Sequence, residues 1–172
     1  MKTYIVKVYP NGNRFWCNEK NQLHREDGPA VEFTSGTKEW FINGKRHRED
    51  DPAVEWVNGD KEWYIKGKRH REDGPAIEYA DGSKVWYLNG KLHREGSPAV
   101  EYPDGYKVWY INGKRHREDG PAIEYFDGSK EWYINGKRLT KEEFNNRNKV
   151  ELTLDEIASK FGISVDQLKI KK

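Results

Sequence analysis

The sequence is poor in the residues that build an ordinary globular core. Leu, Ile and Val are scarce, and only 34% of the 172 residues are hydrophobic, whereas 35% are charged. Such a composition is typical of disordered chains, because little apolar surface is available for burial. Aromatic residues, however, reach 13% of the chain, and each buries a large area when it packs. The sequence therefore predicts a thin, extended structure that needs little interior.

The chain also has few cysteines, little net charge and no long apolar run. Cys17 is the only cysteine, which excludes an intramolecular disulfide and a cysteine-based zinc cluster. Basic and acidic residues, 31 and 29, leave a net charge of +2, and this balance disfavours nucleic acid as a partner. No stretch approaches transmembrane length, and the apolar run in residues 1–10 is too short for a signal peptide. We expect a cytoplasmic protein without a membrane span.

What the chain does have is a 23-residue repeat. Each unit carries two turn signals, such as Asp81-Gly82 and Asn89-Gly90, between short runs rich in β-forming residues. The pattern predicts five units over residues 24–138, preceded by a degenerate capping repeat over residues 1–23. Histidine and tryptophan mark the period: His24, His47, His70, His93 and His116; Trp40, Trp63, Trp86, Trp109 and Trp132.

Two registers compete at the Asp-Gly turn. A two-residue loop pairs Ile77 with Trp86 and places Ile77, Tyr79 and Trp86 on one face. A three-residue loop with a bulge instead pairs Glu78 with Lys84 and forms an equivalent Glu–Lys pair in all five units. Burial of a large apolar side chain is worth about 1.5–3 kcal/mol and a cross-strand charge pair only about 0.2–1 kcal/mol. We therefore expect the two-residue register.

The Asn-Gly turn defines two faces. A two-residue loop there pairs Trp63 with His70 on one face and Tyr64 with Arg69 on the other, and the repeat turns these pairs into columns. Tyr and Arg are enriched at interface hot spots, although the rings could equally well only shield one side of the sheet. The candidate binding residues are Phe41, Tyr64, Tyr87, Tyr110, Tyr133, Arg46, Arg69, Arg115 and Arg138.

After Arg138 the repeat ends. Thr140-Lys-Glu-Glu143 is a capping box that predicts a short helix, so residues 139–149 are interpreted as a capping helix and linker. A second capping box, Thr153-Leu-Asp-Glu156, opens another helix, and residues 150–172 are interpreted as a small α or β-α-β element. The expected fold is all-β: an elongated antiparallel single-layer repeat sheet with a small C-terminal helical appendage.

The repeat resembles a known family. Trp-x-x-Asn-Gly-Lys-x-His at 23-residue spacing, followed by glycine and then Asp-Gly, is similar to the MORN (membrane occupation and recognition nexus) repeat over residues 1–138. The variant HREDGPA…WYxNGK looks like repeats of tailed phages and giant DNA viruses. The resemblance implies a protein-binding scaffold without catalytic residues, and in some members lipid head-group binding. By analogy it suggests a phage-encoded factor that binds and inhibits a host defence protein in the host cytoplasm.

The chemically suggestive residues have simpler interpretations. One histidine per unit is a poor start for a metal site, which needs several ligands together. The Glu-Asp pair of each His-Arg-Glu-Asp string recurs in several units, whereas catalytic constellations are singular. We expect no enzyme, no metal and no cofactor, and a second protein as the partner. The alternative is an anionic ligand (nucleotide signal, lipid head group or nucleic acid) on the Tyr–Arg face, and pairing of the Thr3–Tyr9 edge with another copy stays open.

Overall fold

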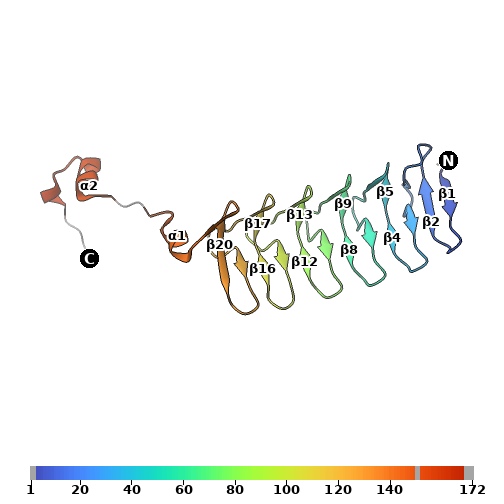
Figure 1. Ribbon diagram of the computed structural model, residues 1–172. Helices are drawn as coiled ribbons and strands as arrows, with labels where there is room; N and C mark the ends of the chain where they lie inside the picture. Colours follow the sequence, from blue (N-terminus) through green and yellow to red (C-terminus); the bar gives the residue numbers. More distant parts are fainter. Residues whose placement is uncertain (1–2, 150–151, 169–172) are drawn as a thin grey trace. The chain divides into compact units, whose positions relative to one another are not determined.

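The computed structural model describes residues 3–149 and 152–168. The chain divides into two compact units, residues 1–139 and 140–172. The described part of the first unit consists of short antiparallel strands and turns, and the described part of the second holds the helices (Figure 1). The predicted all-β repeat sheet with a helical appendage is therefore confirmed, and its hairpins are consistent with a MORN-like repeat fold.

One antiparallel sheet of 13 strands runs through the first unit, with neighbours in sequence order. Figure 1 shows its strands side by side along the unit, from β1 in blue to β20 in orange. The strands are β1 (Ile5–Val8), β2 (Arg14–Cys17), β3 (Val31–Glu32), β4 (Lys38–Glu39), β7 (Val54–Glu55), β8 (Lys61–Glu62), β11 (Ile77–Glu78), β12 (Lys84–Val85), β15 (Val100–Glu101), β16 (Lys107–Val108), β19 (Ile123–Glu124), β20 (Lys130–Ile134) and β21 (Lys137–Leu139).

A second row of small hairpins lies along the edge of this unit (Figure 1). Each is closed by the Asn-Gly turn, or by Lys66-Gly67 in one unit, and its register is the predicted one, with Tyr64 opposite Arg69. The hairpins consist of β5 (Phe41–Ile42) with β6 (Lys45–Arg46), β9 (Tyr64–Ile65) with β10 (Lys68–Arg69), β13 (Tyr87–Leu88) with β14 (Lys91–Leu92), and β17 (Tyr110–Ile111) with β18 (Lys114–Arg115).

The expected register at the Asp-Gly turn is wrong. Ile77 pairs with Val85 and Glu78 with Lys84, as the alternative with a three-residue loop requires. The Gly82 amide donates to the Tyr79 carbonyl oxygen at 3.0 Å. Of Asp81 and Gly82, only Gly82 has a positive φ, of 90°. A type I turn followed by a left-handed glycine has this geometry. The Asp81 carboxylate favours it further, because it accepts the Ser83 amide at 2.8 Å.

The comparison of burial with charge pairing predicted the wrong register because the observed register, with Glu78 opposite Lys84, also buries the apolar side chains. Ile77 is still buried beside Val85 on one face. Trp63, on the other face, is covered by the Arg71 guanidinium instead of by an aliphatic neighbour. A slip of one residue moves every side chain to the opposite face, so Tyr79 lies on the face of Tyr87 and not on that of Trp86.

The observed register creates a row of alternating charge across the sheet. Each strand from β2 to β20 of this sheet contributes one residue, and every basic side chain in the interior of the row has an acidic residue opposite it on both neighbouring strands. Opposite charges on facing strands contribute about 0.2–1 kcal/mol per pair, and the glutamates of the row also form ion pairs with the arginines of the strings, as Glu78 does with Arg71. The row consists of Arg14, Glu32, Lys38, Glu55, Lys61, Glu78, Lys84, Glu101, Lys107, Glu124 and Lys130.

The buried residues form a thin seam rather than a globular core. One alanine of each unit is fully buried, and its carbonyl oxygen accepts the amide of a tryptophan, as Ala76 does from Trp63 of the neighbouring strand at 2.8 Å. Beside these alanines lie the buried aliphatic residues Val31, Val54, Ile77, Val85, Val108 and Ile123. This arrangement confirms the prediction of a structure with little interior.

A test of the turn chemistry is available at Lys66. Lys66 occupies the left-handed position with φ of 51°, where the four neighbouring turns have asparagine. Asparagine adopts this conformation more easily than lysine. We expect Lys66→Asn to raise the free energy of unfolding by about 0.5–1 kcal/mol, measured by urea denaturation. Asn89→Lys is the matched reverse change and is expected to destabilise; an unchanged or lower stability of Lys66→Asn would contradict the argument.

The second unit contains the predicted capped helices. Thr140 is the N-cap of helix α1 (Lys141–Asn146), and Thr153 is the N-cap of α2 (Leu154–Phe161). Each helix has a complete capping box. Gly162 ends α2 in the left-handed conformation, and a 3₁₀ turn, η1 (Val165–Gln167), follows. The outer strands of the β-α-β alternative would fall largely on residues 150–151 and 169–172, which lie outside the described residues. In the parts of the chain that are described, no helix is long and apolar enough to cross a membrane.

Candidate functional site

The arginine of each His-Arg-Glu-Asp string, and of the corresponding His-Arg-Glu-Gly at residues 93–96, joins its own unit to the preceding one. The Arg71 guanidinium carbon lies 4.1 Å from the centre of the Trp63 ring. Its Nε donates to Asp73 at 3.0 Å, and its Nη1 donates to the Pro75 carbonyl oxygen at 3.3 Å and to Glu78 at 2.9 Å. The stacking recurs for Arg25 on Trp16, Arg48 on Trp40, Arg94 on Trp86 and Arg117 on Trp109.

The glycine of the Asp-Gly-Pro bend makes room for this arginine. A Cβ at Gly74 would lie 2.9 Å from the Arg71 guanidinium carbon, although the φ of Gly74 is not in the left-handed region. The second unit has Asp51 at this position, and its carboxylate instead bonds to Arg48 Nη2 at 2.8 Å. Asp51 is therefore a replacement for the usual acidic partner of the arginine.

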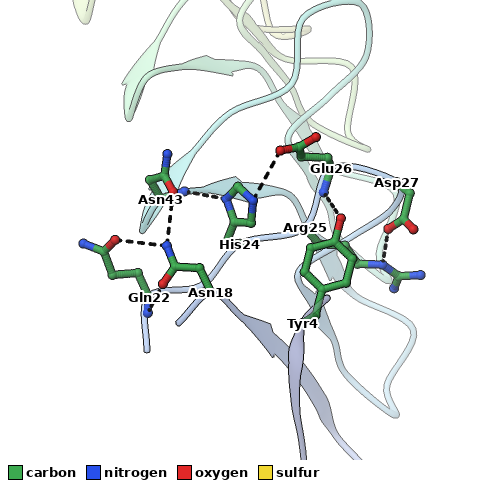
Figure 2. Close-up of polar contacts among 8 residues, drawn as sticks. All are labelled: Tyr4, Asn18, Gln22, His24, Arg25, Glu26, Asp27 and Asn43. Carbon is green, nitrogen blue, oxygen red and sulfur yellow. Dashed lines mark hydrogen bonds and ion pairs between the residues drawn. The ribbon is translucent and has the colours of Figure 1, made fainter. Parts of the chain in front are cut away.

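The histidine of each string contacts the Asn-Gly turn of its own unit, or Lys66-Gly67 in the second unit. Figure 2 shows the first case: His24 Nδ1 accepts the backbone amide of Asn43 at 3.1 Å, and its Nε2 lies 3.5 Å from Glu26. The Tyr4 hydroxyl accepts the Glu26 amide beside it at 3.2 Å (Figure 2). Equivalent Nδ1 contacts join His47 to Lys66, His70 to Asn89, His93 to Asn112 and His116 to Asn135, at 3.0–3.2 Å.

These contacts give the conspicuous string a structural explanation. The histidine accepts an amide from the second turn of its own unit, the arginine covers a tryptophan of the preceding unit, and Asp73 and its counterparts hold the arginine. A hollow of about 380 Å³ on this face is bounded by Trp63, Ile65, His70 and acidic residues of the strings. Within residues 3–149 and 152–168, no three His, Cys, Asp or Glu side chains come together as a metal site.

On the opposite face, the predicted Tyr and Arg residues form a ladder. The Arg46 guanidinium carbon lies 5.8 Å from the centre of the Phe41 ring and 5.5 Å from that of Tyr64. Arg69 lies between Tyr64 and Tyr87 at 5.8 and 5.5 Å. Such distances allow cation–π attraction between successive units. The ladder is interrupted at Leu92 and resumes with Tyr110, Arg115, Tyr133 and Arg138.

Carboxylates beneath the ladder neutralise most of its arginines. Arg46 Nη2 lies 2.9 Å from Glu39, and Arg69 Nη2 lies 3.0 Å from Glu62. The Tyr64 hydroxyl also donates to Glu62 at 2.8 Å. Burial first, and then this hydrogen bond, raises the pKa of Tyr64. Tyr64 itself is only 8% exposed, so this part of the ladder acts as a packed layer, in agreement with the shielding interpretation.

A second aromatic row on the same face was not predicted. In each unit an aromatic residue begins the Asp-Gly turn: Phe33, Trp56, Tyr79, Tyr102 and Tyr125. Trp56, Tyr79 and Tyr102 are each about 40% exposed. Trp56 Nε1 donates to Glu62 at 3.3 Å, which joins the row to the ladder. We call the row and the ladder together the Tyr–Arg face. The 23-residue period of these aromatics could have revealed them, but the expected register assigned Tyr79 to the tryptophan side.

Comparisons with known proteins give no relatives. A scan against protein-family models found no match, and a search of curated proteins found none either. The functional argument therefore depends on the residues of this chain.

Proposed function

We propose that the chain is a non-catalytic repeat scaffold that binds another protein through its Tyr–Arg face. The observation that carries the proposal is the continuous row of half-exposed aromatic side chains beside the arginine ladder. Tyr, Trp and Arg dominate interface hot spots, because they combine a large contact area with specific polar groups. The sheet presents them in a fixed, regularly spaced array.

The exposed rings are also pre-organised for binding. Trp56 is held by its hydrogen bond to Glu62, and Tyr102 contacts Tyr106 with ring centres 5.6 Å apart. Side chains that are already ordered lose less conformational entropy when a partner binds. These two contacts therefore support a binding role for the row over a merely protective one.

The anionic-ligand alternative is supported at one position only. A face that binds phosphates or nucleic acid needs cations without internal partners. Arg46, Arg69 and Arg138 are each paired with a glutamate of the same face, Glu39, Glu62 and Glu131. Only Arg115 of the ladder forms no ion pair with a described residue. The face as a whole therefore fits a protein partner better than a polyanion.

The more specific version of the proposal concerns the source of the partner. The HREDGPA…WYxNGK form of the repeat is similar to repeats of tailed phages and giant DNA viruses, and it suggests a phage-encoded factor whose partner is a host protein. This step rests on the motif resemblance alone.

The test compares matched variants in pull-downs from lysate. We expect the wild-type chain to retain one protein stoichiometrically, and the double variant Tyr79→Ala/Tyr102→Ala to lose it, because removal of hot-spot aromatics costs about 2 kcal/mol or more each. The control is Glu49→Gln/Glu72→Gln, since both glutamates are strongly exposed in the strings on the tryptophan side. Equal retention by both double variants, or no stoichiometric partner, would contradict the proposal.

A further inference from the structure

Arg115 differs from the other arginines of the ladder. Each of the others has a glutamate seven residues earlier and pairs with it: Glu39 with Arg46, Glu62 with Arg69, and Glu131 with Arg138. The residue seven positions before Arg115 is Val108. In the remaining unit both members are apolar, Val85 and Leu92. Arg115 is thus the one ladder arginine whose internal counter-charge has been replaced while the cation has been kept.

Two tyrosine hydroxyls take the place of the missing carboxylate. Arg115 Nε donates to the Tyr110 hydroxyl, and Arg115 Nη1 donates to the Tyr133 hydroxyl, both at 3.3 Å. Tyr133 in turn donates its proton to Glu131 at 2.7 Å. The Tyr110 hydroxyl accepts from Arg115, so its own proton is available for an incoming acceptor. Arginine has five N–H donors, and two contacts to neutral hydroxyls leave the remaining donors and the positive charge for a ligand.

A second departure from the repeat lies at the same place. Tyr106 stands where the other units have the smaller residues Thr37, Asp60, Ser83 and Ser129. Its ring contacts Tyr102 and Tyr125, with centres 5.6 and 5.5 Å apart. The charge of Arg115 acts on both Tyr106 and Tyr125, where it opposes the rise in pKa that burial causes. The unneutralised cation is therefore flanked by the densest group of tyrosines on the face.

We propose that Arg115 and the Tyr110 hydroxyl form a subsite for a carboxylate, namely an Asp or Glu side chain of the bound protein. The inference rests on the proposed protein-binding function and names the partner's chemistry at one point. The internal glutamates show that ladder arginines are placed to meet a carboxylate, and a partner's carboxylate would supply the charge that Val108 does not. Arginine and carboxylate form strong, directional, charge-assisted pairs, and the surrounding tyrosines would exclude water from the pair.

The first arm of the test needs no partner. Arginine Nε–H signals of the full chain are followed by NMR during titration with sodium acetate, with sodium phosphate as the second probe and sodium chloride as the control for ionic strength. We expect a saturable shift of the Arg115 signal with acetate and none for Arg69, whose charge is already paired. No response of Arg115, an equal response of Arg69, or clearly tighter binding of phosphate would overturn the carboxylate assignment.

The second arm uses a variant in which a new internal carboxylate competes with acetate for Arg115. Val108→Glu recreates the Glu–Arg pair of the other units, so acetate should no longer shift Arg115, and affinity for the protein retained in the pull-down should fall about tenfold or more. Arg115→Leu, which copies the residue at Leu92, is expected to weaken binding similarly and serves if Val108→Glu does not fold. Unchanged affinity in a folded variant would overturn the subsite yet leave the scaffold function standing. If no protein is retained at all, the proposed function fails, and the acetate titration still decides whether Arg115 accepts a carboxylate.

Discussion

Arg71→Ala is expected to lower the free energy of unfolding by about 2–3 kcal/mol. The change removes the cation–π contact with Trp63, worth about 0.5–1 kcal/mol, and the charge-assisted hydrogen bond to Glu78, worth about 1.5–3 kcal/mol. It also leaves the Pro75 carbonyl oxygen without this donor. The loss stays below the sum of these contributions because the guanidinium is partly exposed to solvent. Urea denaturation followed by tryptophan fluorescence measures the loss.

The matched control for this prediction is Arg71→Lys. Lysine keeps the charge but lacks the planar fork that stacks on Trp63 and reaches several acceptors together. We expect it to recover less than half of the lost stability. Equal stability of the wild-type chain and Arg71→Ala would show that Trp63 is held without the Arg71 guanidinium over it. It would contradict the explanation that arginine covers the tryptophans in the observed register.

Arg46→Leu is expected to cost about 3 kcal/mol, because it leaves a buried carboxylate without a partner. Glu39 is only 7% exposed and bonds to Arg46 through Nε at 3.0 Å and Nη2 at 2.9 Å. Removal of one member of a buried ion pair is strongly destabilising, whereas replacement of both members by apolar residues is often neutral. Chemical denaturation of the single variant measures this cost.

The chain itself supplies the matched double variant. Val85 and Leu92 occupy the positions that correspond to Glu39 and Arg46. We therefore expect Glu39→Val/Arg46→Leu to be within about 1 kcal/mol of the wild-type chain, with a coupling energy of about 2 kcal/mol in the double-mutant cycle. Additive effects of the two single changes would show that the ion pair is not the reason for the loss.

The period and the turn residues were sufficient to predict the repeat sheet. Asn43-Gly44 and its equivalents adopt the doubly left-handed turn that the sequence indicates, and the register of the small hairpins follows from it. The Asp-Gly pairs also predict a two-residue hairpin loop, but they form a three-residue loop instead. Asp81 favours the other turn by accepting the Ser83 amide, and the burial estimate failed because the observed register keeps Ile77 buried.

The candidate site was predicted in part. The ladder of Phe41, Tyr64 and Arg69 is present, because it depends only on the register of the Asn-Gly hairpins. The exposed row that includes Tyr79 and Tyr102 was missed, because one residue of slip assigned it to the wrong face. The arginine cover of the tryptophans was missed as well, since it joins residues across a bend that no periodicity specifies.

The pairing of strands also sets the spacing at which this chain can present contacts. Each unit adds two strands to the main sheet, and neighbouring strands lie about 4.8 Å apart, so equivalent side chains recur about every 10 Å. The position of an anchor such as Arg115 relative to Trp56 can therefore change only by whole steps of this size, through gain or loss of a unit. Finer changes of the surface require substitutions within a unit, and Val108 and Tyr106 depart from the repeat in this way.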